Sequence, residues 1–169
     1  MNRNNQWVKT IGPKGRVEHA DWTARFEKLR EVTGTQFPGY LIHEAVAFSE
    51  ATREWVFLPR RESTLAYNDA EDERRGTNLI LTANEDFSKV DARRVGKLTA
   101  ERGFSSLKFL PGTGDRVVVA LKSAENAEAG TQQSFITAFD RTTLRVLLPE
   151  TPVPGGFKFE GLEFARREG

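Results

Sequence analysis

The sequence contains no cysteine, which excludes disulfides, thiolate nucleophiles and cysteine-ligated zinc. Histidine is nearly as scarce: only His19 and His43 occur, in different segments, so one chain cannot form a three-histidine metal site. No run approaches the roughly 18 apolar residues of a membrane-spanning helix, and residues 1–9 contain no apolar signal-peptide core. We therefore expect neither a membrane segment nor a signal peptide in this chain.

The chain also has no marked excess of positive or of negative side chains. The chain has 25 Lys and Arg against 24 Asp and Glu, a net charge of +1, which gives no general attraction to nucleic acid. Apolar material is present, because 38% of the 169 residues are hydrophobic and 12 are Phe. That composition predicts a folded core, and the length alone is typical of one domain.

One segment has the spacing of a helix. Asp21 is the candidate N-cap and Gly34 the expected end. Between them, apolar side chains recur at helical intervals, at Trp22, Phe26, Leu29 and Val32. This pattern predicts one amphipathic helix that packs on the body of the protein.

The chain after Tyr40 has the pattern of short strands and turns. We expect strands at residues 40–48, 55–58, 78–83, 94–98, 105–110, 117–122, 134–139, 144–148 and 157–164. Two polar loops, residues 60–76 and 123–131, interrupt the series. The predicted fold class is all-β with one connecting helix.

Three of the expected strands share a five-residue pattern. Its first position is Glu44, Ser105 or Glu160; its third is aliphatic and its fifth is Phe. The copies are 61 and 55 residues apart, with about four strands from one copy to the next. Four antiparallel strands per repeat are typical of a β-propeller blade.

The first position of this pattern carries an oxygen on an otherwise apolar strand face. Corresponding positions of successive blades can converge on a propeller axis, where oxygen ligands suit a hard cation such as calcium. The alternative is that these residues lie in solvent at a strand end and that the repeat reflects core packing alone.

Several motifs resemble the soluble calcium-activated nucleotidases, or apyrases. They are Pro38-Gly39-Tyr40-Leu41-Ile42-His43-Glu44, Phe57-Leu58-Pro59-Arg60-Arg61, Asp72-Glu73-Arg74-Arg75-Gly76, Gly103-Phe104-Ser105-Ser106-Leu107-Lys108-Phe109, Val119-Ala120-Leu121-Lys122-Ser123, Leu147-Leu148-Pro149-Glu150-Thr151 and Phe159-Glu160-Gly161-Leu162-Glu163-Phe164. Residues 7–32 are similar to the family's lead-in to its third blade. The resemblance is thus spread over most of the chain.

The resemblance implies a five-bladed β-propeller that hydrolyses nucleoside di- and triphosphates, such as UDP and GDP, by calcium-assisted attack of water. It also implies one axial Ca²⁺, with Glu44, Ser105 and Glu160 as its ligands in this chain. On this basis residues 1–169 form the C-terminal portion of one propeller domain, about three blades, and the first two blades are missing. Family habit implies secretion or the ER/Golgi lumen.

The candidates for phosphate binding are Arg60 and Arg61, which follow a strand expected to end at Pro59. Arginine forks match phosphate oxygens in a bidentate manner. The alternative for Arg60 is a surface residue paired with the acidic loop 71–73. His43 could act as a base, but a packed, hydrogen-bonded histidine is the other reading, and no general base is assigned.

Two further alternatives remain open. The chain could be a non-catalytic propeller fragment that binds calcium or nucleotide, or an interaction module. A homodimer, or pairing with the missing N-terminal blades, would close the propeller.

Overall fold

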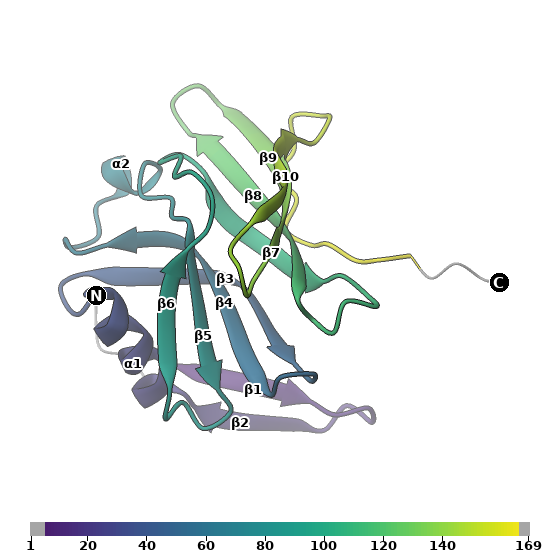
Figure 1. The fold of residues 1–169 in the computed structure, drawn as a ribbon. Coiled ribbons are helices and arrows are strands. Elements are labelled where there is room, and N and C mark those ends of the chain that lie inside the picture. Colours follow the sequence, from purple (N-terminus) through teal and green to yellow (C-terminus); the bar gives the residue numbers. More distant parts are fainter. Residues whose placement is uncertain (1–5, 166–169) are drawn as a thin grey trace.

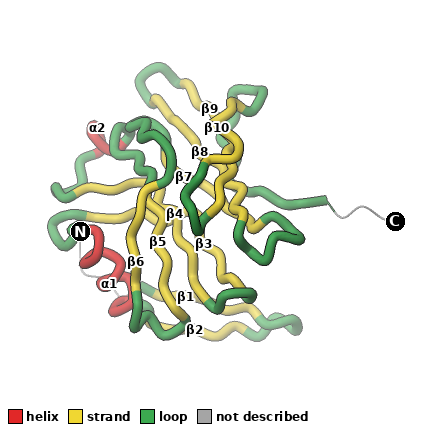
Figure 2. The backbone as a smooth tube through the Cα atoms, viewed as in Figure 1, coloured by secondary structure: helices red, strands yellow, loops and turns green. Residues whose placement is uncertain are grey.

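The computed structural model describes residues 6–165, and most of its regular secondary structure consists of antiparallel strands (Figures 1 and 2). The elements, in order, are β1 (Trp7–Ile11), β2 (Val17–Asp21), α1 (Thr23–Thr33), β3 (Tyr40–Ser49), β4 (Glu54–Ser63), α2 (Asp69–Asp72), β5 (Leu79–Asn84), β6 (Val90–Arg94), β7 (Gly103–Phe109), β8 (Val117–Asn126), β9 (Thr131–Asp140) and β10 (Val146–Pro152). Neither helix is long and apolar enough to span a membrane. The predicted all-β class is confirmed.

Two four-stranded antiparallel sheets form the body of the molecule. The first has the order β3-β4-β5-β6 and the second the order β10-β9-β8-β7, so each is a simple meander of consecutive strands. The strands β3 and β7 that begin the two sheets carry the first two copies of the sequence repeat. The repeat therefore marks successive sheets of four strands, as its spacing predicted.

The two sheets share one core. Buried side chains from both sheets form it, with β7 packed against β3 and β4: Ala45, Val56, Leu58, Ile80, Val95, Phe104, Leu107, Val118, Ala120 and Phe139. Apolar residues on one face of each sheet are thereby removed from water, the main favourable term in folding.

A second core covers the opposite face of the first sheet. Trp22 and Leu29 from the helical segment pack there on Phe57, Leu81 and neighbouring residues. Figure 1 shows α1 and the β1–β2 hairpin beside the first sheet, away from the second sheet. The first sheet is therefore buried on both faces.

The predicted helix is present, with one correction at its start. Trp22 occupies the N-cap position without a side-chain capping bond, while Asp21 lies at the end of β2 and accepts a bond from the Thr23 amide at 2.9 Å. At the other end Gly34 adopts a left-handed conformation, φ 70°, which glycine enters without a steric penalty. The expected end of the helix is confirmed.

The sequence interpretation missed the β1–β2 hairpin and ended β4 too early. Pro59 lies inside β4, opposite His43, where the register shifts. The strand tolerates a proline there because β5 pairs with β4 only as far as Phe57, so beyond this point β4 hydrogen-bonds within its sheet to β3 alone. Arg60 and Arg61 consequently belong to a strand, whereas a polar loop was expected.

The expected last strand is also wrong. Residues 153–165 contain no strand; the yellow segment in Figure 1 first runs along the second sheet, and only its last part projects from it. The segment is held by side chains: Ser134 Oγ donates to the Phe157 carbonyl at 2.9 Å and accepts from the Phe159 amide at 2.8 Å. These bonds tie the segment to β9 without a backbone ladder.

Candidate functional site

Glu44 and Ser105 occupy equivalent irregular positions in the two sheets. The pairing of β3 with β4 skips Glu44, between His43 and Ala45, and the pairing of β7 with β8 skips Ser105, between Phe104 and Ser106. Such bulges leave one residue outside the ladder and re-aim its side chain, which is why they are common beside functional sites. In the first two copies of the repeat, the residue at the first position therefore has the same backbone geometry, a bulge.

Arg60 joins the first sheet to the second beside Glu44. Its side chain is 6% exposed, and its Nη1 lies 3.1 Å from Glu44 Oε2 and 2.5 Å from Ser123 Oγ. Its Nη2 forms an ion pair with Glu125, which stands near the end of β8. Arg60 is therefore neither a surface residue nor paired with the acidic loop 71–73, as one reading of the sequence had it.

Lys158 continues this network to Glu160. Its Nζ lies 3.3 Å from Glu125 Oε1 and 3.1 Å from Glu160 Oε1. Ion pairs thus connect five side chains in series, which we call the charge ladder: Glu44, Arg60, Glu125, Lys158 and Glu160. The ladder brings two of the predicted metal ligands into one network.

Ser105, the third predicted ligand, reaches the same segment from β7. Its Oγ donates to the Phe159 carbonyl at 3.0 Å, next to Glu160 in the chain. The predicted set is thus two carboxylates and one hydroxyl. Within residues 6–165, no group of three or more acidic or histidine side chains is arranged to hold a metal ion.

Arg61 points to other partners than Arg60. It is 2% exposed, and its Nε lies 3.5 Å from Asp72 Oδ2, an ion pair without hydrogen-bond geometry. Burial and the adjacent Arg60 lower the pKa of the Arg61 guanidinium. Asp72 also accepts a 2.6 Å bond from the Tyr40 hydroxyl, and burial together with that bond raises the pKa of Tyr40. It is Arg61, then, that anchors the acidic loop.

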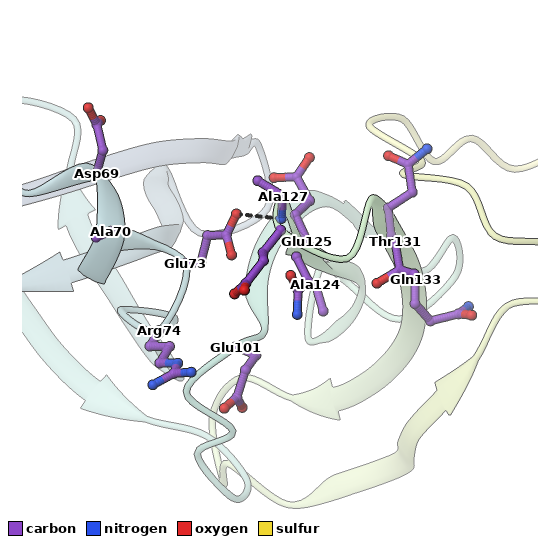
Figure 3. Close-up of a pocket in the computed structure, with 13 residues that line it drawn as sticks. Asp69, Ala70, Glu73, Arg74, Glu101, Ala124, Glu125, Ala127, Thr131 and Gln133 are labelled. Atoms are coloured by element: carbon purple, nitrogen blue, oxygen red, sulfur yellow. Dashed lines mark hydrogen bonds between the residues drawn. The ribbon is translucent and has the colours of Figure 1, made fainter.

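A pocket of about 830 Å³ opens between the α2 segment and the β8–β9 hairpin (Figure 3). Glu73 spans it, accepting a 2.9 Å bond from the Ala127 amide. Its charged lining is one Arg and five carboxylates: Arg74, Asp69, Glu73, Glu101, Glu125 and Glu128. Such a lining repels a bare polyphosphate. Glu125 links this pocket to the charge ladder.

His43 lies on the other face of the first sheet. Its ring packs against Phe26 and Phe57, and its Nδ1 is buried without a hydrogen-bond partner in the described structure. Burial, with Arg30 nearby, lowers the pKa of His43 to about 4. His43 is therefore packed, as one reading of the sequence predicted, but its Nδ1 makes no hydrogen bond within the described residues.

The sequence interpretation did not find three members of the network. Glu125 and Ser123 lay in a segment expected to be a polar loop, whereas both belong to β8. Lys158 stands two residues before Glu160, and nothing in the local pattern distinguishes it from a solvated lysine. Only the packing of the terminal segment on the second sheet places it between two carboxylates.

Comparison with known proteins gives the family. The Apyrase family model matches residues 1–165. Soluble calcium-activated nucleotidase 1 of Rattus norvegicus is 46% identical over 97% of this chain, and the match covers 40% of that protein. Apyrase apy-1 of Caenorhabditis elegans is 39% identical over 98% of this chain, and the match covers 46% of that protein. An apyrase of Cimex lectularius is 38% identical over 96% of this chain, and the match covers 44% of that protein. The chain spans less than half the length of these relatives, yet it matches the family model over nearly all of its own length. It belongs to the apyrase family.

Proposed function

We propose that this chain carries part of a calcium-dependent nucleotidase that hydrolyses nucleoside di- and triphosphates, such as UDP and GDP, to release phosphate. The observation that carries the proposal is the shared bulge geometry of Glu44 and Ser105, together with the ladder that joins Glu44 to Glu160. The printed names of the relatives, calcium-activated nucleotidase and apyrase, support the same activity.

The donor chemistry fits calcium. Glu44, Ser105 and Glu160 offer only oxygen, the ligand that a hard cation prefers. Both carboxylates already neutralise a cationic side chain, so positive charge is stabilised at each of them. We assign the three residues as calcium ligands, which leaves further coordination positions for other oxygens or water.

When bound, calcium would neutralise charge on phosphoryl oxygens and orient an attacking water. Arg60 and Arg61 would contact the phosphates, with their guanidinium forks directed at phosphoryl oxygens. Arg60 is the better placed of the two because it adjoins Glu44, whereas Arg61 is committed to Asp72. The bonds from Arg60 to Glu44, Ser123 and Glu125 would hold its guanidinium in a fixed orientation.

For the architecture, we propose that the two sheets are successive blades of a β-propeller. Their meander topology, their four strands each and the placement of the repeat on β3 and β7 support this. Residues 1–169 would then form the C-terminal portion of one propeller domain, about three blades with the third incomplete, and two further blades would complete the family's five. By relation to the family, we propose a location in the secretory pathway.

The first test removes a proposed ligand. In a phosphate-release assay of the complete propeller with UDP and GDP, titrated with calcium, we expect Glu44→Ala to raise the calcium requirement by more than about 10-fold, the least that loss of an outer-shell partner of a metal costs. Glu163→Ala is the matched control, because that carboxylate is 74% exposed and pairs only with Lys108 in the described structure. A Glu44→Ala protein with the parent's calcium titration and activity would remove the ligand assignment.

The alternative is a calcium- or nucleotide-binding module without catalysis, and saturation of Arg60 by two carboxylates favours it. The same assay with calcium and with a chelator separates the two. Binding without turnover supports the module, while calcium-dependent release supports the enzyme. Association of two chains, or pairing with N-terminal blades, would appear as a second species in sedimentation.

A further inference from the structure

The charge ladder places the protein's own cations on the carboxylates proposed as metal ligands. Arg60 neutralises Glu44 from 3.1 Å, and Lys158 neutralises Glu160 from 3.1 Å. Both cations are also held by Glu125, which lies between them. A divalent cation would therefore meet carboxylates that are already occupied.

We infer that Arg60 and Lys158 compete with a divalent cation for Glu44 and Glu160, and that Glu125 retains the displaced cations beside the site. The inference rests on the proposed function and deepens it, since it names residues that set the metal affinity. It assigns Glu125 and Lys158 to the site as positioning residues.

The net charge of the charge ladder supports the replacement of Arg60 and Lys158 by a divalent cation at these carboxylates. The ladder holds three carboxylates and two cations, a net charge of −1, so a divalent ion at Glu44 and Glu160 reverses the local sign. Because like charges repel, the arriving ion weakens the hold of these two carboxylates on Arg60 and Lys158. Their pairs with Glu125 are not shared with the ion, so both cations stay close.

The consequence is a link between metal and anion binding. Cations tied only to Glu125 have N–H donors to spare, and Arg60 additionally keeps Ser123 as a partner on the second sheet. The freed donors face a site whose net charge has become positive. Phosphoryl oxygens would then meet arginine and lysine that are otherwise neutralised.

The test is the calcium affinity itself, measured by titration calorimetry on the chain without nucleotide. Lys158→Gln removes one competitor from a side chain that is 21% exposed, so the fold should tolerate the change. We expect its Kd for calcium to fall by about 3- to 10-fold, the range for one charge at the edge of solvent. Lys108→Gln loses the same charge from the Glu163 pair and should remain within about twofold of the parent.

Glu125→Gln should change the calcium affinity in the opposite direction. Without this carboxylate, Arg60 and Lys158 have only Glu44 and Glu160 as acidic partners in the ladder, so calcium should bind several-fold more weakly than to the parent. If the Lys158→Gln protein binds calcium with unchanged or lower affinity than the parent, the inference is overturned, while the proposed metal site still stands. Absence of calcium binding by the parent overturns the proposed metal site, and the inference with it.

Discussion

Gly103 lies where the start of β7 closely approaches the backbone of β4. A Cβ at this position would overlap the Arg60 carbonyl oxygen and approach Arg61 Nη1 to 2.7 Å. Backbone cannot give way as a flexible side chain can, so no larger residue fits between the two sheets here. The close approach is what allows Arg60 on β4 to reach Ser123 and Glu125 on β8.

At the residue scale we therefore expect Gly103→Ala to lower the free energy of unfolding by about 1–3 kcal/mol, the usual cost of overpacking. Urea denaturation followed by circular dichroism measures it. Gly161→Ala is the control, because that glycine has open space around its Cβ position and should change the free energy by less than about 0.5 kcal/mol. Equal effects of the two substitutions would contradict the close approach.

The residue pattern selected candidate positions, but it did not reveal the surroundings of those residues. The pattern of the repeat selected Glu44, Ser105 and Glu160, and the structure places two of them on equivalent bulges. It did not reveal that Arg60 is buried between sheets, because burial of an arginine depends on acidic partners 16 and 65 residues away. The assignment of all these residues to calcium and phosphate stays a prediction.

At the scale of elements, β8 and β10 are joined by an ion triad around the buried Lys122, across one face of the second sheet. Glu150 on β10 accepts from Lys122 Nζ at 2.7 Å and from Arg102 Nη1 at 2.9 Å. Lys122 is 1% exposed, and burial lowers the pKa of its ammonium group. Burial raises the pKa of Glu150, but the bonds from both cations outweigh it, so the net pKa is lowered.

We expect Glu150→Gln to lower the free energy of unfolding by about 3 kcal/mol near pH 7, because it leaves Lys122 charged and buried without a counter-ion. Chemical denaturation measures the effect, with Glu85→Gln, an exposed partner of Arg53, as the neutral control. A loss no larger than that of the control would contradict the triad's role.

The same triad predicts a pH dependence. The pKa of Glu150 is lower in the folded protein than in the unfolded chain, so its stabilisation is complete above the ordinary value of 4.5 and is lost as the pH falls through the folded value. Parent and Glu150→Gln should therefore converge in stability below about pH 4.5. If the free energies of unfolding of the parent and of Glu150→Gln differed by a constant amount down to pH 3, the predicted direction of the pH dependence would be wrong.

At the scale of the whole molecule, the two sheets should unfold together because they share one core. Leu58 on β4 is fully buried among side chains that include Phe104 and Val118 of the second sheet. Arg141 adds a polar clamp at one end, donating to Glu54 at 2.9 Å and to Thr52 at 2.6 Å across the same boundary. Neither sheet buries its inner face alone.

Leu58→Ala should cost about 2–5 kcal/mol through lost burial and the cavity left behind. We expect amide hydrogen exchange to quicken in β8 and β9 as well as in β3 and β4. Val146→Ala, on the exposed side of β10, is the control and should change little. Faster exchange confined to the first sheet would show that the sheets open independently.

The all-β class, helix α1 with its glycine end, the four-strand repeat and the family followed from the sequence alone, because periodicity, turn residues and motif order are local properties. The sequence interpretation missed the β1–β2 hairpin and was wrong at Pro59, at residues 95–98 and at residues 157–164, where the outcome depends on which strand lies alongside. Only the tertiary structure decided that Arg60, Glu125 and Lys158 join Glu44 to Glu160. Ion pairs between segments distant in the chain require the packing of two sheets, and no local pattern encodes that distance.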